Sequence, residues 1–176
     1  LHEETPFQPG HWRSRRDLNG GGVFIDSGIH KAHLLRYLVG EPVHLYAAAL
    51  PQALAQHEGE DGMVVMTRGA SGVVSMIHHA WTSAHSPAPP WAAVSGTRGR
   101  LSFELGALWL RLEQGSAEQT WQCADDARGL IPMVLAFRDS IRAGQEPEMS
   151  GAEGLRDLAG VLKAYESMAR GGALPL

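Results

Sequence analysis

Short apolar segments alternate with glycine-containing turns from residue 43 to residue 123, and this alternation constrains the fold more than any other feature. The turns at residues 69–72 and 96–99 each separate two apolar runs, which is the pattern of a hairpin. Turns this short join antiparallel strands, because parallel strands need a crossover of about a dozen residues or more. The strands are expected near residues 43–50, 63–68, 73–77, 91–95, 100–104, 108–112 and 119–123.

Helical segments precede and follow these strands. Residues 28–39, 130–143 and 151–170 have helical composition, and each is followed by glycine, which commonly ends a helix. Residues 1–19 are polar and are expected to have little regular structure. A helix, then antiparallel strands, then two helices is the order of an α+β fold.

Composition narrows the functional classes. A hydrophobic content of 44% excludes a disordered chain, because such chains lack the apolar surface to offset ordering entropy. A net charge of −4 and a pI near 6.1 argue against nucleic-acid and anionic-membrane partners, which need a basic face. No apolar run is long enough to span a bilayer, and no signal peptide is recognisable. The single cysteine, Cys123, fits a reducing compartment, so we expect a cytoplasmic protein.

The strongest chemical signal lies at the start of the first long helix. At about 100° per residue, Asp26, His30, His33 and Tyr37 fall within a sector of roughly 60°. Asp26 precedes His30 by one turn, so its carboxylate is expected to orient the imidazole and stabilise its protonated form. General acid–base catalysis requires this pairing of a base with a group that orients it.

Other interpretations of this stripe stay open. Asp26 also fits a helix N-cap, and Asp26, His30 and His33 also fit a small zinc site. Because no further ligand or Cys/His cluster is evident, we expect no metal. The preceding glycines, Gly20 to Gly22, allow a backbone or a flat ligand to approach closely. They do not form the G-x-G-x-x-G fingerprint of a dinucleotide-binding domain.

Several further residues are candidates for binding a small molecule. Trp12 and Arg13 precede the glycines, and an arginine there suits a carboxylate or polyol oxygen. His85 lies in the loop after an expected strand, beyond His78, His79 and Trp81. On that strand, His78 is expected to point away from His79. Ordinary sheet packing is the alternative for these strand residues.

The sequence resembles the glucose–fructose oxidoreductase/inositol dehydrogenase (Gfo/Idh/MocA) family, specifically its C-terminal domain. The resemblance is carried first by Trp12-Arg13 and by Gly20-Gly21-Gly22-Val23-Phe24-Ile25-Asp26-Ser27-Gly28-Ile29-His30. It continues through Leu38-Val39-Gly40-Glu41-Pro42, Gly96-Thr97-Arg98-Gly99-Arg100-Leu101, Glu148-Met149-Ser150-Gly151-Ala152-Glu153-Gly154-Leu155 and Ala164-Tyr165-Glu166-Ser167. It therefore covers nearly the whole chain.

The resemblance implies an open, mostly antiparallel sheet with helices on one face, as in the C-terminal domain of dihydrodipicolinate reductase. Residues 1–176 would form this substrate-binding and oligomerisation domain, with one sheet face serving a homo-oligomer. Family members add an N-terminal Rossmann domain that binds NAD or NADP, and their active site lies between the two domains. The intact protein would then oxidise or reduce a small molecule such as a sugar or polyol.

The resemblance also implies individual roles. His30 would take a hydroxyl proton as hydride leaves for the nicotinamide, and Asp26 would orient the substrate and a lysine of the Rossmann half. Trp12, Arg13, His33 and His85 are expected on the substrate side, and Gly21 and Gly22 beside the cofactor. His33 replaces an aspartate that is frequent in the family. Without the Rossmann half, the chain is expected to bind no cofactor and to be inactive alone. A non-catalytic binding or oligomerisation module of the same fold is the alternative.

Overall fold

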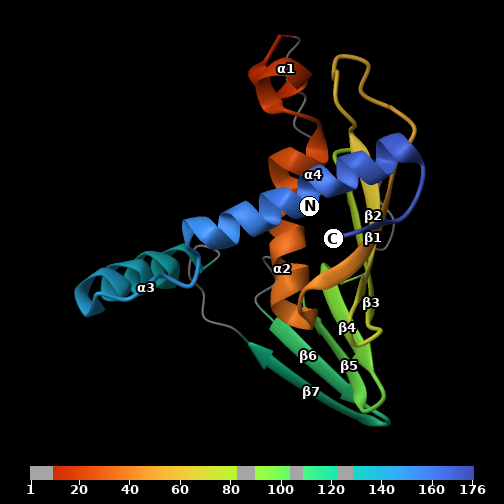
Figure 1. Cartoon of the computed structure of the whole chain (residues 1–176). Helices are drawn as coiled ribbons and strands as arrows, with labels where there is room; N and C mark the ends of the chain where they lie inside the picture. The colour runs from red at the N-terminus through yellow and green to blue at the C-terminus, as the bar shows by residue number, and fades with distance from the viewer. Residues whose placement is uncertain (1–9, 83–89, 104–108, 123–128) are drawn as a thin grey trace. The chain divides into compact units, whose positions relative to one another are not determined.

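The computed structural model describes residues 10–82, 90–103, 109–122 and 129–176. The chain divides into two compact units, Leu1–Ala84 with Gly151–Leu176, and His85–Ser150. Figure 1 shows the elements of both units. Among the described residues, no helix combines the length and the apolar character needed to cross a membrane.

The first unit contains a four-stranded antiparallel sheet with the order β3-β2-β1-β8. Its strands are β1 (Pro42–Ala49), β2 (Gly62–Gly69), β3 (Val74–Ala80) and β8 (Leu174–Pro175). Its helices are η1 (Trp12–Ser14), α1 (Arg16–Asn19), η2 (Phe24–Gly28), α2 (Ile29–Val39) and α4 (Gly151–Arg170). η2 is a single π-helical turn that leads directly into α2.

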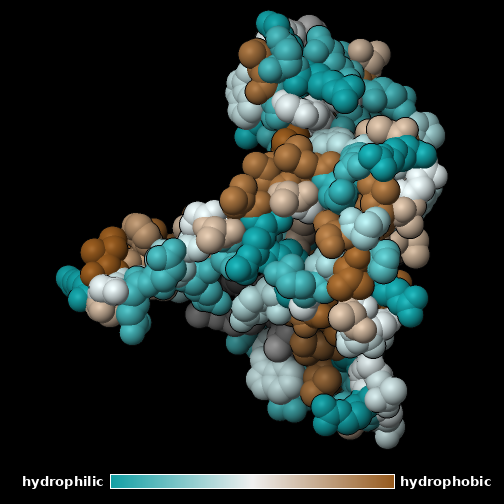
Figure 2. All heavy atoms as spheres, viewed as in Figure 1, coloured by the Kyte–Doolittle hydropathy of each residue, from teal (hydrophilic) through white to brown (hydrophobic). Residues whose placement is uncertain are grey.

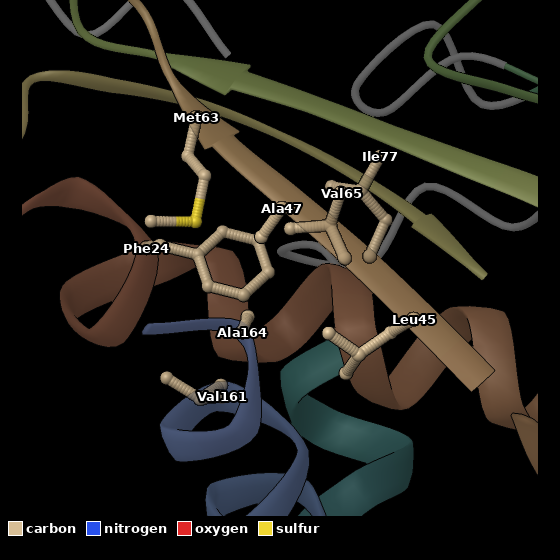
Figure 3. Packing of buried hydrophobic residues seen from close by; sticks show 8 residues of the cluster. All are labelled: Phe24, Leu45, Ala47, Met63, Val65, Ile77, Val161 and Ala164. Carbon is tan, nitrogen blue, oxygen red and sulfur yellow. The ribbon is translucent and has the colours of Figure 1, made fainter. Parts of the chain in front are cut away.

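One face of this sheet carries the core. Alternate residues of a strand point to the same face, and Leu45, Ala47, Val65 and Ile77 are accordingly buried together. Phe24 packs into this cluster from η2, and the ring lies between Met63 and Ala164 in Figure 3. The buried residues of α4 recur at helical spacing and form the side that faces the sheet. They are Asp157, Val161, Ala164 and Ser167.

The second unit contains an antiparallel meander, β4 (Ala92–Gly96), β5 (Gly99–Phe103), β6 (Trp109–Gln114) and β7 (Ala117–Gln122). It also contains α3 (Leu130–Ala143). Large apolar side chains of α3 are exposed, and they appear as brown spheres in Figure 2. These residues are Leu130, Ile131, Met133, Val134, Leu135, Phe137 and Ile141.

The α+β fold with antiparallel strands is confirmed, and its strands are shared between two sheets. One local expectation was wrong, and one short strand was not predicted. The leading segment contains the short helices η1 and α1, and α1 ends at Gly20, whose φ of 84° is left-handed and therefore favours glycine. The short strand β8 pairs with β1, a tertiary contact that two residues after a helix-ending glycine do not signal.

Candidate functional site

The candidate site is built around the glycine turn that leads into η2. Gly21 and Gly22 are buried. A Cβ on Gly22 would lie 1.9 Å from the Glu60 carbonyl oxygen, and one on Gly21 would lie 2.3 Å from the Tyr165 hydroxyl oxygen. The chain's own segments therefore fill the space that the missing side chains leave. Glycine is required here by internal packing, and the expected contact of Gly21 and Gly22 with a cofactor stays a prediction.

Tyr165 and Glu60 hold the backbone of this turn. The Tyr165 hydroxyl accepts hydrogen bonds from the N–H groups of Gly22 (3.1 Å) and Ile25 (3.2 Å). It donates to Glu60 Oε1 at 2.8 Å, which also accepts the Phe24 N–H at 2.9 Å. Burial is the main cause that raises the pKa of Glu60, and burial and then the charge of Glu60 raise the pKa of Tyr165 above its ordinary value.

Asp26 lies within the π-helical turn, with only 9% of its side chain exposed. Its Oδ1 forms an ion pair with Arg13 Nε at 2.9 Å. The Arg13 guanidinium in turn lies 5.1 Å from the ring centroid of Trp12, a cation–π distance. The structure thus brings together three of the residues that the sequence predicted for the site.

His30 is exposed at the first turn of α2. No hydrogen bond or ion pair joins it to Asp26 among the residues that the structure describes. Asp26 lies in the π-helical turn, and its carboxylate pairs with Arg13 instead. The two side chains share one end of the helix, but the direct pair that was expected is absent from the described contacts.

His33 points toward α4. Its Nδ1 lies 3.0 Å from Oδ2 of Asp157, a carboxylate that also pairs with Arg36. Asp26 and His33 therefore pair with different segments, Arg13 and Asp157, and their sharing of one stripe with His30 stays a prediction. Within the described parts of the chain, no group of three or more His, Cys, Asp and Glu side chains is arranged to hold a metal ion. His85 and Cys123 lie outside the described residues.

A buried histidine also borders this helix end, one that the sequence analysis named as a strand-edge candidate with sheet packing as the alternative. His79 on β3 is 3% exposed, and its Nε2 lies 2.8 Å from Ser27 Oγ while its Nδ1 contacts Lys31 Nζ. Burial, followed by the charge of Lys31, lowers the pKa of His79 to about 3. A lysine ammonium only donates, so Nδ1 is the acceptor and Nε2–H donates to Ser27. The strand alternation did predict that His79 and His78 point in opposite directions, as observed.

Residues 1–102 match the GFO/IDH/MocA C-terminal domain, and this match covers more than half of the chain. The chain belongs to the Gfo/Idh/MocA family. It is 28% identical over 170 residues to the 1,5-anhydro-D-fructose reductase of Ensifer adhaerens. That alignment covers 92% of this chain and 50% of the reductase, so the chain spans about half the length of this curated relative.

Solved structures share the Gfo/Idh/MocA fold seen here. The aldose-aldose oxidoreductase of Caulobacter crescentus, complexed with glycerol, has a TM-score of 0.82 at 24% identity, over 96% of this chain and 51% of that chain. A levoglucosan dehydrogenase in complex with NADH and levoglucosan has a TM-score of 0.81 at 21% identity, over 97% of this chain and 54% of that chain. In this family member, the nearly buried Asp26 lies in η2 and the exposed His30 lies in the first turn of α2, with no described contact between them.

Proposed function

We propose that this chain is the substrate-side half of an NAD(P)-dependent oxidoreductase. The reaction moves a hydride between a nicotinamide and a secondary alcohol or ketone of a sugar, polyol or similar small molecule. The observation that carries this proposal is the placement of a carboxylate and an imidazole, Asp26 and His30, at one helix end of a Gfo/Idh/MocA domain. The names of the relatives, a sugar reductase and a sugar dehydrogenase, support the substrate class.

In the proposed reaction, this chain performs the proton transfer. When the alcohol is oxidised, its C–H bond breaks and the hydride passes to the nicotinamide, which the other half of the protein would supply. The O–H bond breaks at the same time, and His30 takes the proton as general base. His30 suits this role because it is exposed and a neutral imidazole has a ring nitrogen that can accept a proton.

Asp26 and Arg13 would organise the substrate. Asp26 is nearly buried, so its carboxylate is held in one place, and we propose that it orients the reacting hydroxyl. Arg13 is 40% exposed beyond its ion pair with Asp26, and Trp12 is 49% exposed. A planar cation and an aromatic face suit the oxygens and the C–H face of a sugar, so both residues are assigned to substrate binding.

The test uses the full-length protein with NAD and NADP and a panel of sugars and polyols. His30→Ala and Asp26→Ala should each lower kcat by on the order of 10²–10⁴, the usual contribution of a positioned acid–base group. Exposed His44 on β1 offers a matched control, and His44→Ala should keep kcat within about threefold. The assignment fails if His30→Ala and Asp26→Ala both turn over substrate within about threefold of the unmodified protein.

A second function has one observation in its favour. On the sheet face that points away from the core, Tyr46, Met66 and Met76 lie side by side in the strand register and are 41%, 45% and 66% exposed. Exposed apolar patches commonly mark protein interfaces, and we propose that this face joins two copies of the chain. Sedimentation of Met66→Glu tests it, because a dimer through this face should become monomeric, whereas an unchanged sedimentation coefficient contradicts the interface.

A further inference from the structure

The start of η2 has a complete set of partners for its backbone donors. The first four N–H groups of a helix have no acceptor within the helix. Here the N–H groups of Gly22 and Ile25 donate to the Tyr165 hydroxyl, and that of Phe24 donates to Glu60 Oε1. The Val23 N–H donates to the Glu60 carbonyl oxygen at 2.8 Å. The Asp26 N–H donates to the Gly22 carbonyl oxygen at 3.3 Å.

These partners are distant in sequence. Glu60 lies 36 residues after Phe24, and Tyr165 lies 140 residues after Ile25. A helix N-terminus is ordinarily capped by the side chain of its own N-cap residue, but Val23 has no such group. The cap is supplied instead by α4 and by the loop before β2. The conformation of the turn therefore depends on a tertiary contact between the Tyr165 hydroxyl and the Glu60 carboxylate, 2.8 Å apart.

The Tyr165–Glu60 contact supports the backbone next to Asp26 in the proposed site. Asp26 follows Ile25 directly in the chain. The Ile25 N–H donates to the Tyr165 hydroxyl. A π-helical turn is an uncommon conformation that is frequent at functional sites, and it needs its surroundings to hold it. A buried hydroxyl and carboxylate that accept two of its N–H groups, those of Phe24 and Ile25, and that of the preceding Gly22 supply that support.

The geometry points to Tyr165 and Glu60 as positioning residues for Asp26: their hydrogen-bonded pair caps the π-helical turn and so fixes the carboxylate that orients the substrate. This inference rests on the proposed function. Both residues act through the backbone, and neither is expected to touch the substrate. Because a misplacement of about 1 Å can cost on the order of 10²-fold in rate, a loss of either group should appear in kcat.

The test uses three substitutions in the full-length protein. Tyr165→Phe removes the hydroxyl that accepts two N–H groups, and Glu60→Leu removes the acceptor of Phe24; each should lower kcat about tenfold to a hundredfold. KM should change by less than about threefold, since the groups that contact the substrate remain. Glu60→Gln keeps a side-chain oxygen that accepts both bonds and should restore most of kcat. Combining Tyr165→Phe with Glu60→Leu should lower kcat little further, because the two residues act as a unit.

A control separates positioning from general destabilisation. Ser167, two residues after Tyr165 on α4, is fully buried; it accepts the Ala47 N–H at 3.0 Å and donates to the Gly172 carbonyl at 2.6 Å. Ser167→Ala should lower the melting temperature but leave the kcat of the folded enzyme within about threefold. An equal loss of kcat in Ser167→Ala overturns the inference. If Tyr165→Phe does not fold, Glu60→Leu measured against Glu60→Gln carries the test.

Asp26→Ala distinguishes the two proposals. If Asp26→Ala loses activity while Tyr165→Phe and Glu60→Leu keep kcat within about threefold, the positioning role is wrong and the proposed function stands. If Asp26→Ala keeps its activity, the positioning role fails, and the proposed function fails with it only if His30→Ala also keeps its activity.

Discussion

The two ends of helix α2 are both joined to helix α4, but by different chemistry. At the C-terminal end Arg36, with 11% of its side chain exposed, pairs with Asp157, with Glu41 at 2.6 Å and with Glu153 at 3.0 Å. The bonds to Glu41, then Asp157 and Glu153, raise the pKa of Arg36. Before the N-terminal end, the Tyr165 hydroxyl of α4 binds the backbone N–H groups of Gly22 and of Ile25 in η2, the turn that leads into α2.

The two ends of α2 are expected to serve different purposes, folding stability at one end and catalysis at the other. At the C-terminal end, the charged side chains form ion pairs with one another. At the N-terminal end, buried groups hold the backbone and leave His30 exposed and Asp26 facing Arg13. Substitutions at the C-terminal end should therefore change folding stability, and substitutions at the N-terminal end should change turnover.

The largest stability effect is expected from Asp157→Ala. Asp157 is 4% exposed and binds both Arg36 and His33, so its removal leaves a mostly buried guanidinium without its most buried acceptor. Loss of one partner from a buried pair should lower the free energy of unfolding by about 3 kcal/mol. Urea denaturation of the unmodified protein and of Asp157→Ala measures this difference in the free energy of unfolding. A change below about 1 kcal/mol would show that Glu41 and Glu153 suffice to compensate Arg36.

The N-terminal end should show the stronger acid sensitivity. The ordinary pKa of histidine is 6.5, and burial together with Lys31 lowers that of His79 to about 3. Between these values the unfolded chain binds a proton that the folded chain does not. Stability should therefore fall as the pH drops through this window, by up to about 1.4 kcal/mol per pH unit.

Comparison with His79→Asn isolates this contribution. The pKa of Glu60 is raised, so its own contribution to stability decreases as the pH rises, opposite in sign to that of His79. Because Glu60 is present in both proteins, its contribution cancels in the difference. Melting temperatures at several pH values between 4 and 7 should fall more steeply toward acid for the unmodified protein, and parallel curves would contradict the burial of a neutral His79.

The smallest effect is expected from Glu41→Gln. Glu41 is 62% exposed, and exposed ion pairs contribute at most about 1 kcal/mol because solvent and salt screen them. The loss in the free energy of unfolding should be a few tenths of a kcal/mol and should shrink further in high salt. A loss as large as that of Asp157→Ala would mean that exposure does not determine the strength of the contacts of Arg36.

The sequence was sufficient for most of the longer elements and not for their tertiary contacts. Periodicity and glycine positions placed α3, α4 and the strands β1 to β7 close to their observed bounds, because hydrophobic alternation is a local property. The strand β8 was missed because its two residues are recognisable only through pairing with β1.

The site was predicted in part for the same reason. The Asp26 and His30 pattern is local, so the sequence placed both at the start of α2. The π-helical turn is held by Glu60 and Tyr165 from distant segments, so the local pattern did not predict it. The pairing of His33 with Asp157 and of His79 with Ser27 likewise needed the folded chain.

The most direct test of the account is the rate of nicotinamide reduction in a single turnover of the full-length protein with His30→Ala. Stopped-flow absorbance of the nicotinamide isolates the chemical step from product release. The account predicts that this rate falls by on the order of 10²–10⁴, while Asp157→Ala reduces the same rate by less than about threefold per folded molecule. A His30→Ala enzyme that reduces the nicotinamide as fast as the unmodified protein would contradict the claim that this helix end performs the acid–base chemistry.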